Sequence, residues 1–361
     1  MSGRVYAVIM SGGVGTRFWP LSREKKPKQF LSMGLGKSFL RETFERIVPV
    51  IPKERVFIVT GRKYESLIRC ELPEIPPDNI LLEPVGKNTA PCIGYASAVI
   101  SRIDEGASIV VLPCDHFVKE VDRFREVVKM AVDFAVDMEA ILTVGITPEH
   151  PETGYGYIHT TETVTSPSGG CALRVDSFTE KPDYETAKRF LEEGDYYWNA
   201  GIFISPVGKM LESIATHMPD MHRALEKLSR GLGTDREEEC LNDFFRNVEP
   251  VSIDYGVMEK EEHVFMIEGN YGWSDVGSWQ SAYELIDTDG DGNAVFRGDL
   301  LSIDSQGCYV DAQGKLVVMI GVKDLIAVST DDAILLCERK SSQRVREAVN
   351  LLKVKGRTDL L

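Results

Sequence analysis

Short apolar runs that alternate with amphipathic segments limit most strongly how this chain can fold. Residues 5–10, 56–60, 109–112 and 141–144 are almost wholly apolar or β-branched, which is typical of strands buried on both faces of a sheet. Residues 122–138, between the last two runs, place their apolar side chains on one face of a predicted helix. The alternation predicts an α/β fold with a mostly parallel sheet flanked by helices.

The pattern changes near Asp287. Residues 287–293 are rich in turn-forming residues, and short strand-like runs follow at 300–303, 308–310, 316–320, 325–328 and 333–336. Closely spaced strands separated by turns favour a small all-β unit, which we expect to be β-helix-like. Residues 342–353 are predicted to form a terminal helix. We therefore predict two domains, residues 1–286 and residues 287–361, which agrees with the count of about two that 361 residues give at ~150 residues per domain.

Charge and cysteine content narrow the class of protein. The 361 residues include 41 Lys and Arg and 56 Asp and Glu, a net charge of −15, which argues against binding to nucleic acid or to acidic membranes. No apolar run approaches the ~20 residues of a membrane helix, and the chain enters its first strand directly, without a signal peptide. The seven cysteines are scattered and form no CxxC pair. We therefore expect reduced thiols and a cytoplasmic protein.

A glycine-rich loop follows the first predicted strand, with the sequence Ser11-Gly12-Gly13-Val14-Gly15-Thr16-Arg17. Glycines at such a position let backbone N–H groups approach phosphate oxygens, although a tight turn without a ligand would use the same residues. The loop is not a P-loop, because no Lys-Ser or Lys-Thr pair closes it, and Phe18 replaces the third glycine of a dinucleotide fingerprint. Residues 11–30 hold five basic side chains and one acid, a local charge of +4. This charge favours a polyphosphate ligand.

The residues around and after these glycines carry a family resemblance. Residues 12–23, Gly-Gly-Val-Gly-Thr-Arg-Phe-Trp-Pro-Leu-Ser-Arg, and residues 26–31, Lys-Pro-Lys-Gln-Phe-Leu, resemble the signature of sugar-1-phosphate nucleotidylyltransferases. The Trp-Pro-Leu-Ser-Arg and Pro-Lys-Gln-Phe variants are similar to the mannose-1-phosphate guanylyltransferase branch of that family. The resemblance covers about residues 4–355. It implies a nucleotide-diphospho-sugar transferase fold with a Rossmann-like, mixed sheet. It also implies Mg²⁺ as cofactor and a reaction that turns GTP and mannose 1-phosphate into GDP-mannose and diphosphate.

Further segments supply candidate residues for the nucleotide and for a metal. Glu83 could accept the two parallel hydrogen bonds that guanine donates, although a plain helix start explains part of residues 83–91. Asp115 follows the end of a buried strand, where α/β sheets bind ligands and where a carboxylate suits Mg²⁺; its alternative is an ordinary turn. By resemblance, Asp275 completes the metal pair. The nucleotide-binding residues that the resemblance implies are Gly12, Gly13, Gly15, Thr16, Glu83, Pro84, Asn88, Thr89 and Ala90.

Three later segments occur in the order that the family has and supply candidate sugar-binding residues. Each also has a plain explanation: a hairpin turn at residues 151–158, an exposed ion pair at 178–182, and a turn into a strand at 198–203. The sugar-binding residues that the resemblance implies are Gly156, Tyr157, Glu180 and Asn199. The catalytic residues are Arg17 and Lys28, which would hold the triphosphate, and Lys181, which would steer the sugar phosphate.

Two other functions remain open at this point. One is the same chemistry with another pair of substrates, such as glucose 1-phosphate with UTP or dTTP. The other is a non-catalytic regulatory subunit that binds a sugar nucleotide, which predicts the loss of Arg17, Lys28 or a metal aspartate, although all are present. The resemblance also implies a homodimer. Because the chain ends at Leu361, we expect the transferase without the isomerase domain that some relatives carry.

Overall fold

The computed structural model describes residues 4–32 and 36–361. The chain divides into two compact units, and each is described by itself. Unit 1 holds the described residues up to Gly12, residues Thr43–Cys114 and residues Val118–Trp273, while unit 2 holds residues Gly13–Glu42, Asp115–Phe117 and Ser274–Leu361. Residues 1–3, which precede the first predicted strand, lie outside the described residues. The domain boundary predicted after residue 286 stays a prediction.

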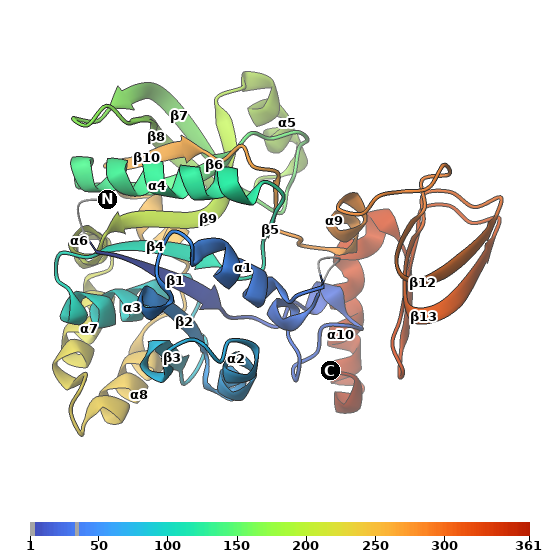
Figure 1. Ribbon diagram of the computed structural model, residues 1–361, viewed down its shortest axis with the longest axis horizontal. Coiled ribbons are helices and arrows are strands. Elements are labelled where there is room, and N and C mark those ends of the chain that lie inside the picture. The colour runs from blue at the N-terminus through green and yellow to red at the C-terminus, as the bar shows by residue number, and fades with distance from the viewer. Residues whose placement is uncertain (1–3, 33–35) are drawn as a thin grey trace. The chain divides into compact units, whose positions relative to one another are not determined.

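A nine-stranded sheet forms the centre of unit 1, in the order β3-β2-β1-β4-β9-β6-β10-β8-β7 (Figure 1). Its strands are β1 (Val5–Ser11), β2 (Val56–Gly61), β3 (Ile80–Glu83), β4 (Ser108–Pro113), β6 (Ile141–Ile146), β7 (Gly156–Thr165), β8 (Cys171–Glu180), β9 (Tyr196–Pro206) and β10 (Val264–Glu268). Among the described strands, β8 and β9 run against the other members, because every pairing that involves them is antiparallel. The mostly parallel sheet predicted from the four apolar runs is confirmed, and so is the mixed character that the resemblance implies.

Helices cover both faces of this sheet. They are α2 (Glu65–Glu71), α3 (Thr89–Ile103), α4 (Val121–Met138), α5 (Tyr184–Glu193), α6 (Val207–His217), α7 (Pro219–Gly231) and α8 (Glu237–Asn247), and α1 (Phe39–Ile47) joins the two units along the chain. Tyr6, Val8 and Met266 of the sheet share one apolar core with α3, α6, α7 and α8. Phe134 of α4 instead packs on Phe265, whose side chain points to the other face because neighbours alternate along a strand.

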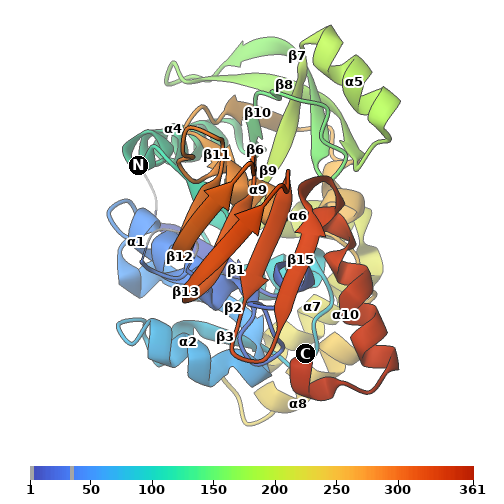
Figure 2. The ribbon, with the colours of Figure 1, turned by 90° about the vertical axis from the view of Figure 1, so that its right-hand side faces the viewer.

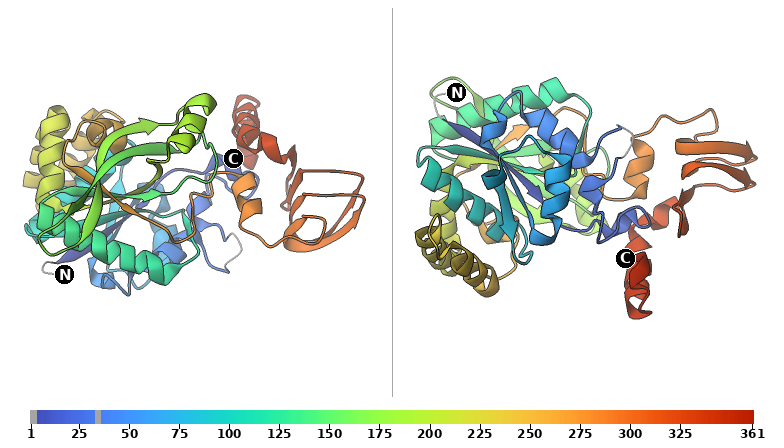
Figure 3. Two further views of the ribbon diagram at one scale, coloured as in Figure 1. Left: turned by 90° about the horizontal axis from the view of Figure 1, so that it is seen from above. Right: turned by 60° about the horizontal axis from the view of Figure 1, so that its bottom comes forward.

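A four-stranded sheet dominates the C-terminal part of unit 2, in the order β12-β13-β14-β15 (Figure 2). The strands are β12 (Ala294–Ile303), β13 (Tyr309–Ile320), β14 (Leu325–Ser329) and β15 (Ile334–Glu338), and the helices are α9 (Trp279–Glu284) and α10 (Val345–Val354) (Figure 3). Parallel pairing of β12, β13 and β14 confirms the predicted β-helix-like character. Short strands β5 (Phe117–Val118) and β11 (Trp273–Ser274) also pair with each other.

Two boundaries in this region differ from the prediction. The runs at 308–310 and 316–320 belong to one strand, β13, because Gln313 and Gly314 adopt positive φ angles of 49° and 85° and bend the strand without ending it. The terminal helix begins at Val345, after a 3₁₀ segment at Arg339–Arg344, and not at residue 342. Val345 and Val349 of this helix are buried.

The core of unit 2 contains residues from both the N-terminal and the C-terminal parts of the chain. Phe18 and Leu31, from the segment that follows the glycine loop, pack with Trp279, Tyr309 and Val345. Trp19 Nε1 donates a hydrogen bond of 2.8 Å to the Leu360 carbonyl, and Trp279 Nε1 donates one of 3.1 Å to the Trp19 carbonyl. Aromatic residues that looked like part of a binding loop in the sequence therefore anchor that loop. In residues 4–32 and 36–361, no helix is both long and apolar enough to span a membrane.

Candidate active site

The glycine-rich loop is held by backbone conformations that only glycine adopts easily. Gly13 and Gly15 have φ angles of 82° and 68°, in the region where a Cβ atom is strained. A Cβ on Gly15 would also lie 2.4 Å from Cβ of Lys28. The Lys28 N–H donates a hydrogen bond of 3.2 Å to the Val14 carbonyl. The loop is thus folded directly against the lysine that the sequence analysis assigned to the triphosphate.

Lys28 contacts both residues of the predicted metal pair in unit 2. The side chain of Lys28 is 7% exposed, and its Nζ donates a hydrogen bond of 2.9 Å to Asp115 Oδ2 and one of 2.7 Å to the main-chain carbonyl of Asp275. The rings of Phe18 and Phe39 lie 5.6 and 5.3 Å from the same ammonium group. A buried lysine stays charged only when it is paired, and here Asp115 supplies the opposite charge.

The charge state of Asp115 follows from these neighbours. Burial acts to raise the pKa of Asp115, but the Lys28 ammonium group and His116 outweigh burial and hold that pKa below its usual value. His116 Nε2 lies 3.9 Å from Asp115 Oδ1. Asp115 is therefore an ionised carboxylate near neutral pH. An ionised carboxylate is the form that binds a metal cation.

The donor set fits Mg²⁺ better than a transition metal. Within residues 4–32 and 36–361, no group of three or more His, Cys, Asp or Glu side chains is placed to hold a metal ion. Zinc sites in proteins use three or four such side chains. Mg²⁺ instead accepts one or two carboxylates and fills its remaining positions with water and substrate phosphates. The predicted pair, Asp115 and Asp275, would supply two carboxylates, a number that Mg²⁺ accepts.

The cations of the +4 segment have different environments. Arg23 is held by protein groups, since its side chain donates to the Pro20 carbonyl at 2.7 Å and to Asp332 at 2.8 Å. Arg17 is partly exposed and has no ion pair or side-chain hydrogen bond with any described residue. Lys25 is fully on the surface. Arg17 therefore keeps a guanidinium group available for an anion, while Arg23 serves the structure.

Glu83 in unit 1 is a buried carboxylate with an unsatisfied oxygen. The residue is 7% exposed, and its Oε1 atom has no hydrogen-bond partner among the described residues. Burial raises its pKa to about 7. Buried polar atoms without partners cost free energy. Guanine, which donates from N1–H and N2–H₂, carries the groups that this oxygen lacks.

The segment after Glu83 leads into the start of helix α3, as a plain helix start would. Asn88, with a φ angle of 72°, caps helix α3 by accepting a hydrogen bond of 2.9 Å from the Thr89 N–H. Thr89 is the first helical residue and not the cap. Its hydroxyl oxygen accepts a hydrogen bond of 2.8 Å from the Ile253 N–H instead. Pro84 is partly exposed and Ala90 is buried.

Glu180, Asn199 and Gly156 meet in unit 1, as the predicted sugar site requires. A Cβ on Gly156 would lie 2.6 Å from Glu180 Oε2 and 3.5 Å from Asn199 Cβ, so this position needs a glycine. Lys181 adopts a positive φ angle of 49°, and its ammonium group pairs with Glu180. Tyr157 does not offer its side chain to a ligand. The ring is fully buried against Phe190, and its hydroxyl accepts a hydrogen bond of 3.0 Å from the Glu152 N–H.

Asp254 is a residue of this cluster that the sequence analysis missed. It lies in a π-helix, Asp254–Met258, and its Oδ1 accepts a hydrogen bond of 2.8 Å from Asn199 Nδ2. Burial, followed by the charge of Glu180, raises its pKa to about 6. No spacing rule links Asp254 to the predicted motifs. The only signal in the sequence is an acid between apolar residues at 251–258.

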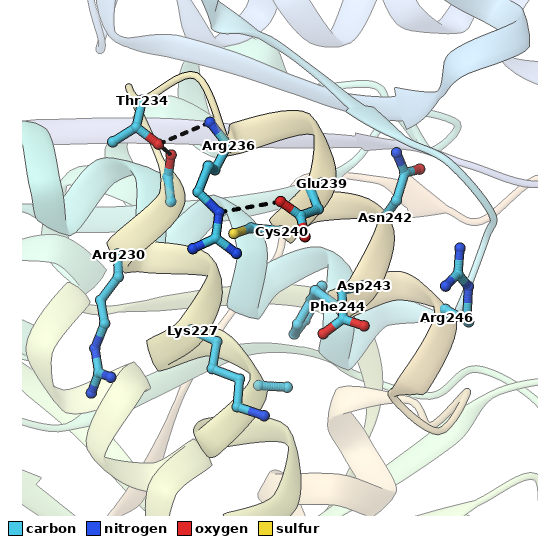
Figure 4. Close-up of a pocket in the computed structure, with 12 residues that line it drawn as sticks. Lys227, Arg230, Thr234, Arg236, Glu239, Cys240, Asn242, Asp243, Phe244 and Arg246 are labelled. Atoms are coloured by element: carbon cyan, nitrogen blue, oxygen red, sulfur yellow. Dashed lines mark hydrogen bonds and ion pairs between the residues drawn. The ribbon is translucent and has the colours of Figure 1, made fainter.

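A second concave region of unit 1 contains none of the predicted site residues. A groove of about 570 Å³ lies between α7 and α8 (Figure 4). Lys227, Arg230 and Arg246 line it together with Arg236, which pairs with Glu239 at 3.2 Å. Its lining residues are mostly exposed, and nothing in the groove resembles a reacting centre.

Comparisons with known proteins agree with the fold and with the motifs. The sequence matches the nucleotidyl transferase family over residues 6–291 and the MannoseP isomerase/GMP-like beta-helix domain over residues 298–352. It is 38% identical over 355 residues to a mannose-1-phosphate guanylyltransferase of Salmonella montevideo. That match covers 97% of this chain and 74% of the relative. It is 36% identical over 363 residues to a protein of the same description from Escherichia coli K12, with coverage of 98% and 74%.

A solved structure has the same fold over nearly its whole length. The crystal structure described as mannose-1-phosphate geranyltransferase from Thermus thermophilus matches with a TM-score of 0.87 at 35% identity. The match covers 97% of this chain and 99% of that chain. Both the large mixed sheet and the C-terminal β-helix region are therefore shared with a protein of known structure.

Proposed function

We propose that this chain, which belongs to the nucleotidyl transferase family and within it to the mannose-1-phosphate guanylyltransferases, makes GDP-mannose by transferring GMP from GTP to mannose 1-phosphate. The observation that supports GTP as the nucleotide is the buried Glu83, whose Oε1 has no hydrogen-bond partner among the described residues and suits a guanine base. Seven free cysteines and the absence of a CxxC pair support a cytoplasmic site for this reaction.

The reaction needs positioning and charge more than a nucleophilic side chain. A phosphate oxygen of mannose 1-phosphate attacks the α-phosphorus of GTP, the bond from that phosphorus to the bridging oxygen of the β-phosphate breaks, and diphosphate leaves. The attacking oxygen is already an anion at neutral pH. The protein therefore contributes by holding two anions in line and by offsetting their repulsion.

Different residues bind the triphosphate, the sugar phosphate, the sugar and the metal. Arg17 and Lys28 bind the triphosphate and stabilise the diphosphate as it leaves, with the backbone N–H groups of Gly12, Gly13, Gly15 and Thr16. Lys181 binds the phosphate of the sugar. Glu180, Asn199 and the backbone at Gly156 and Tyr157 bind the sugar. Asp115 and Asp275 would hold Mg²⁺, which supplies positive charge at the phosphates.

A diphosphate-release assay tests the proposal. GTP, ATP, UTP and dTTP are each combined with mannose 1-phosphate and with glucose 1-phosphate at saturating Mg²⁺. We expect the largest kcat/KM for GTP with mannose 1-phosphate. A larger value for UTP or dTTP with glucose 1-phosphate would identify the other nucleotidylyltransferase chemistry, and no turnover with any pair would indicate a regulatory subunit.

Replacing Arg17 tests the catalytic assignment. Arg17→Ala removes a cation that has no protein partner among the described residues, so folding should be unaffected. We expect kcat/KM to fall by about 100- to 1,000-fold, the usual effect of losing one group that stabilises transition-state charge. Lys25→Ala, which removes an exposed cation of the same segment, is the matched control. Equal activity of the two variants would contradict the role of Arg17.

A further inference from the structure

Asp254 lies where two of the predicted binding segments meet. Its Oδ1 accepts the hydrogen bond from Asn199 Nδ2, which ties it to the sugar segment. One residue earlier, the Ile253 N–H donates to the Thr89 hydroxyl oxygen, and the Ala90 N–H donates to the Val251 carbonyl at 3.1 Å. Residues 251–254 are thereby hydrogen-bonded to the base segment as well. A side chain at this junction is held in a defined place.

The amide of Asn199 is fixed by three hydrogen bonds. Its Oδ1 accepts from the Gly201 N–H at 2.9 Å and from Thr143 Oγ1 at 3.3 Å, while its Nδ2 donates to Asp254. This pattern sets the orientation of the amide and leaves one N–H of Nδ2 for a ligand. Asn199 therefore presents a donor, while its oxygen is engaged by the Gly201 N–H and by the Thr143 hydroxyl proton, which the Ile202 carbonyl shares at 3.2 Å. A sugar hydroxyl that must donate a proton needs another acceptor nearby.

Asp254 and Glu180 supply that acceptor capacity. A carboxylate offers about four lone-pair positions, and among the described residues Asp254 accepts hydrogen bonds from the Asn199 amide and from its own backbone N–H. Glu180 is close enough to act on Asp254 electrostatically, with Lys181 opposing it. Two neighbouring carboxylates in a partly buried site favour a ligand with several uncharged O–H donors. A hexose is such a ligand.

We infer that Asp254 is a further sugar-binding residue, whose carboxylate accepts a hydrogen bond from one hydroxyl of the hexose 1-phosphate beside Asn199 and Glu180. The inference rests on the proposed function and deepens it, since it concerns how the sugar is recognised. The π-helix at Asp254–Met258 agrees with it, because such segments occur frequently at functional sites. A buried acceptor in a fixed place discriminates against a sugar whose hydroxyl does not reach it.

The test pairs changes in the protein with changes in the sugar. Unchanged protein, Asp254→Ala and Asp254→Asn are assayed with mannose 1-phosphate and its 2-, 3-, 4- and 6-deoxy analogues. In the unchanged protein, we expect the analogue that lacks the bonded hydroxyl to raise the KM for the sugar by roughly 10- to 100-fold. In Asp254→Ala the rise in KM caused by that analogue should be about threefold or less. The rises in KM caused by the other analogues, and the KM for GTP, should stay within about threefold of their values in the unchanged protein.

The control is Glu262→Gln, which removes one negative charge from an exposed residue whose side chain has no ion pair or hydrogen bond with described residues. It should leave all of these rises in KM unchanged. Thermal melting verifies folding, and if Asp254→Ala does not fold, Asp254→Asn, which keeps an oxygen for Asn199, provides the same comparison. If the deoxy analogues raise the KM as much in Asp254→Ala as in the unchanged protein, or if all these rises change equally, the inference is overturned and the proposed function is not. Failure of the unchanged protein to use mannose 1-phosphate with GTP would overturn the proposed function, and the inference with it.

Discussion

At the scale of single residues, the burial of the Glu83 carboxylate bears on the proposed recognition of the guanine base. Glu83 is 7% exposed with an unpaired Oε1, and its pKa is raised to about 7 by burial. An acid whose pKa is raised is protonated below that value in the folded protein and ionised above it. Guanine donors need the ionised form. Recognition of the base should therefore weaken as the pH falls through about 7.

The pH dependence of nucleotide binding checks this reasoning. We expect the KM for GTP to rise several-fold between pH 8 and pH 6 in the unchanged protein, and to vary less in Glu83→Gln, whose side chain does not titrate. The phosphates of GTP titrate equally with both proteins, so their effect cancels in the comparison. The same slope in both proteins would remove Glu83 from base recognition.

Gly15 yields a second prediction at this scale. Its φ angle is 68°, and an added Cβ would lie 2.4 Å from Cβ of Lys28, so Gly15→Ala must displace the loop or the lysine. A displacement of about 1 Å near the reacting groups costs on the order of 100-fold in rate, and we expect that loss in kcat/KM. Gly290→Ala, at a position with open space around it, should keep normal kcat/KM. Normal activity of Gly15→Ala would show that Lys28 does not need this loop.

At the scale of elements, one ion pair joins β12 to β13. Arg297 and Asp311 are partners in the strand register. The guanidinium group of Arg297 donates to Asp311 from Nε at 2.8 Å and from a terminal nitrogen at 2.6 Å. Asp311 is fully buried. Burial raises its pKa, and Arg297 opposes that rise.

Removing Arg297 alone should therefore destabilise this sheet. We expect Arg297→Met to lower the free energy of unfolding by about 3 kcal/mol, because it leaves a buried carboxylate unpaired. The double variant Arg297→Met, Asp311→Leu should recover most of the loss, since it removes both charges. Urea denaturation followed by circular dichroism measures both. A double variant as unstable as the single one would mean that packing, and not charge, holds the two strands together.

At the scale of the whole molecule, the homodimer stays a prediction, and one surface of unit 2 suits it. Exposed apolar side chains cross the outer face of the β12–β13 ribbon, with Leu301 opposite Val318 and Ile303 opposite Ile320. These four residues are 46–64% exposed. Two copies that each carry −15 charges repel one another unless they meet at an uncharged surface. We therefore expect a second copy to cover this ribbon.

Sedimentation velocity checks that expectation. The unchanged protein should sediment as a dimer of 40.3 kDa chains, and Val318→Asp should shift it toward the monomer, because a charge would be buried at the interface. Val85→Asp, at a position 49% exposed outside the ribbon, should remain dimeric. A dimer that persists in Val318→Asp would place the interface elsewhere.

Local patterns in the sequence were sufficient for the elements and for the family. The apolar runs became β1, β2, β4 and β6 with boundaries within about two residues, because a run of apolar side chains has no stable place except between two covering layers. The signature at residues 12–31 predicted the family that the comparisons report. It did so because phosphate-binding loops need glycines and cations that are close together in the sequence.

Contacts between distant residues were decided only by the tertiary structure. Lys28 meets Asp275 across 247 positions of sequence, and Asn199 meets Asp254 across 55, and no local spacing encodes either pair. The same is true of Tyr157, whose side chain is buried although its motif suggested a ligand, and of Trp19, which anchors unit 2. Sequence alone determined which residue types are present for phosphate, base and sugar chemistry. Packing determined which of them face a ligand, because burial and hydrogen bonding depend on neighbours that the folded chain brings together.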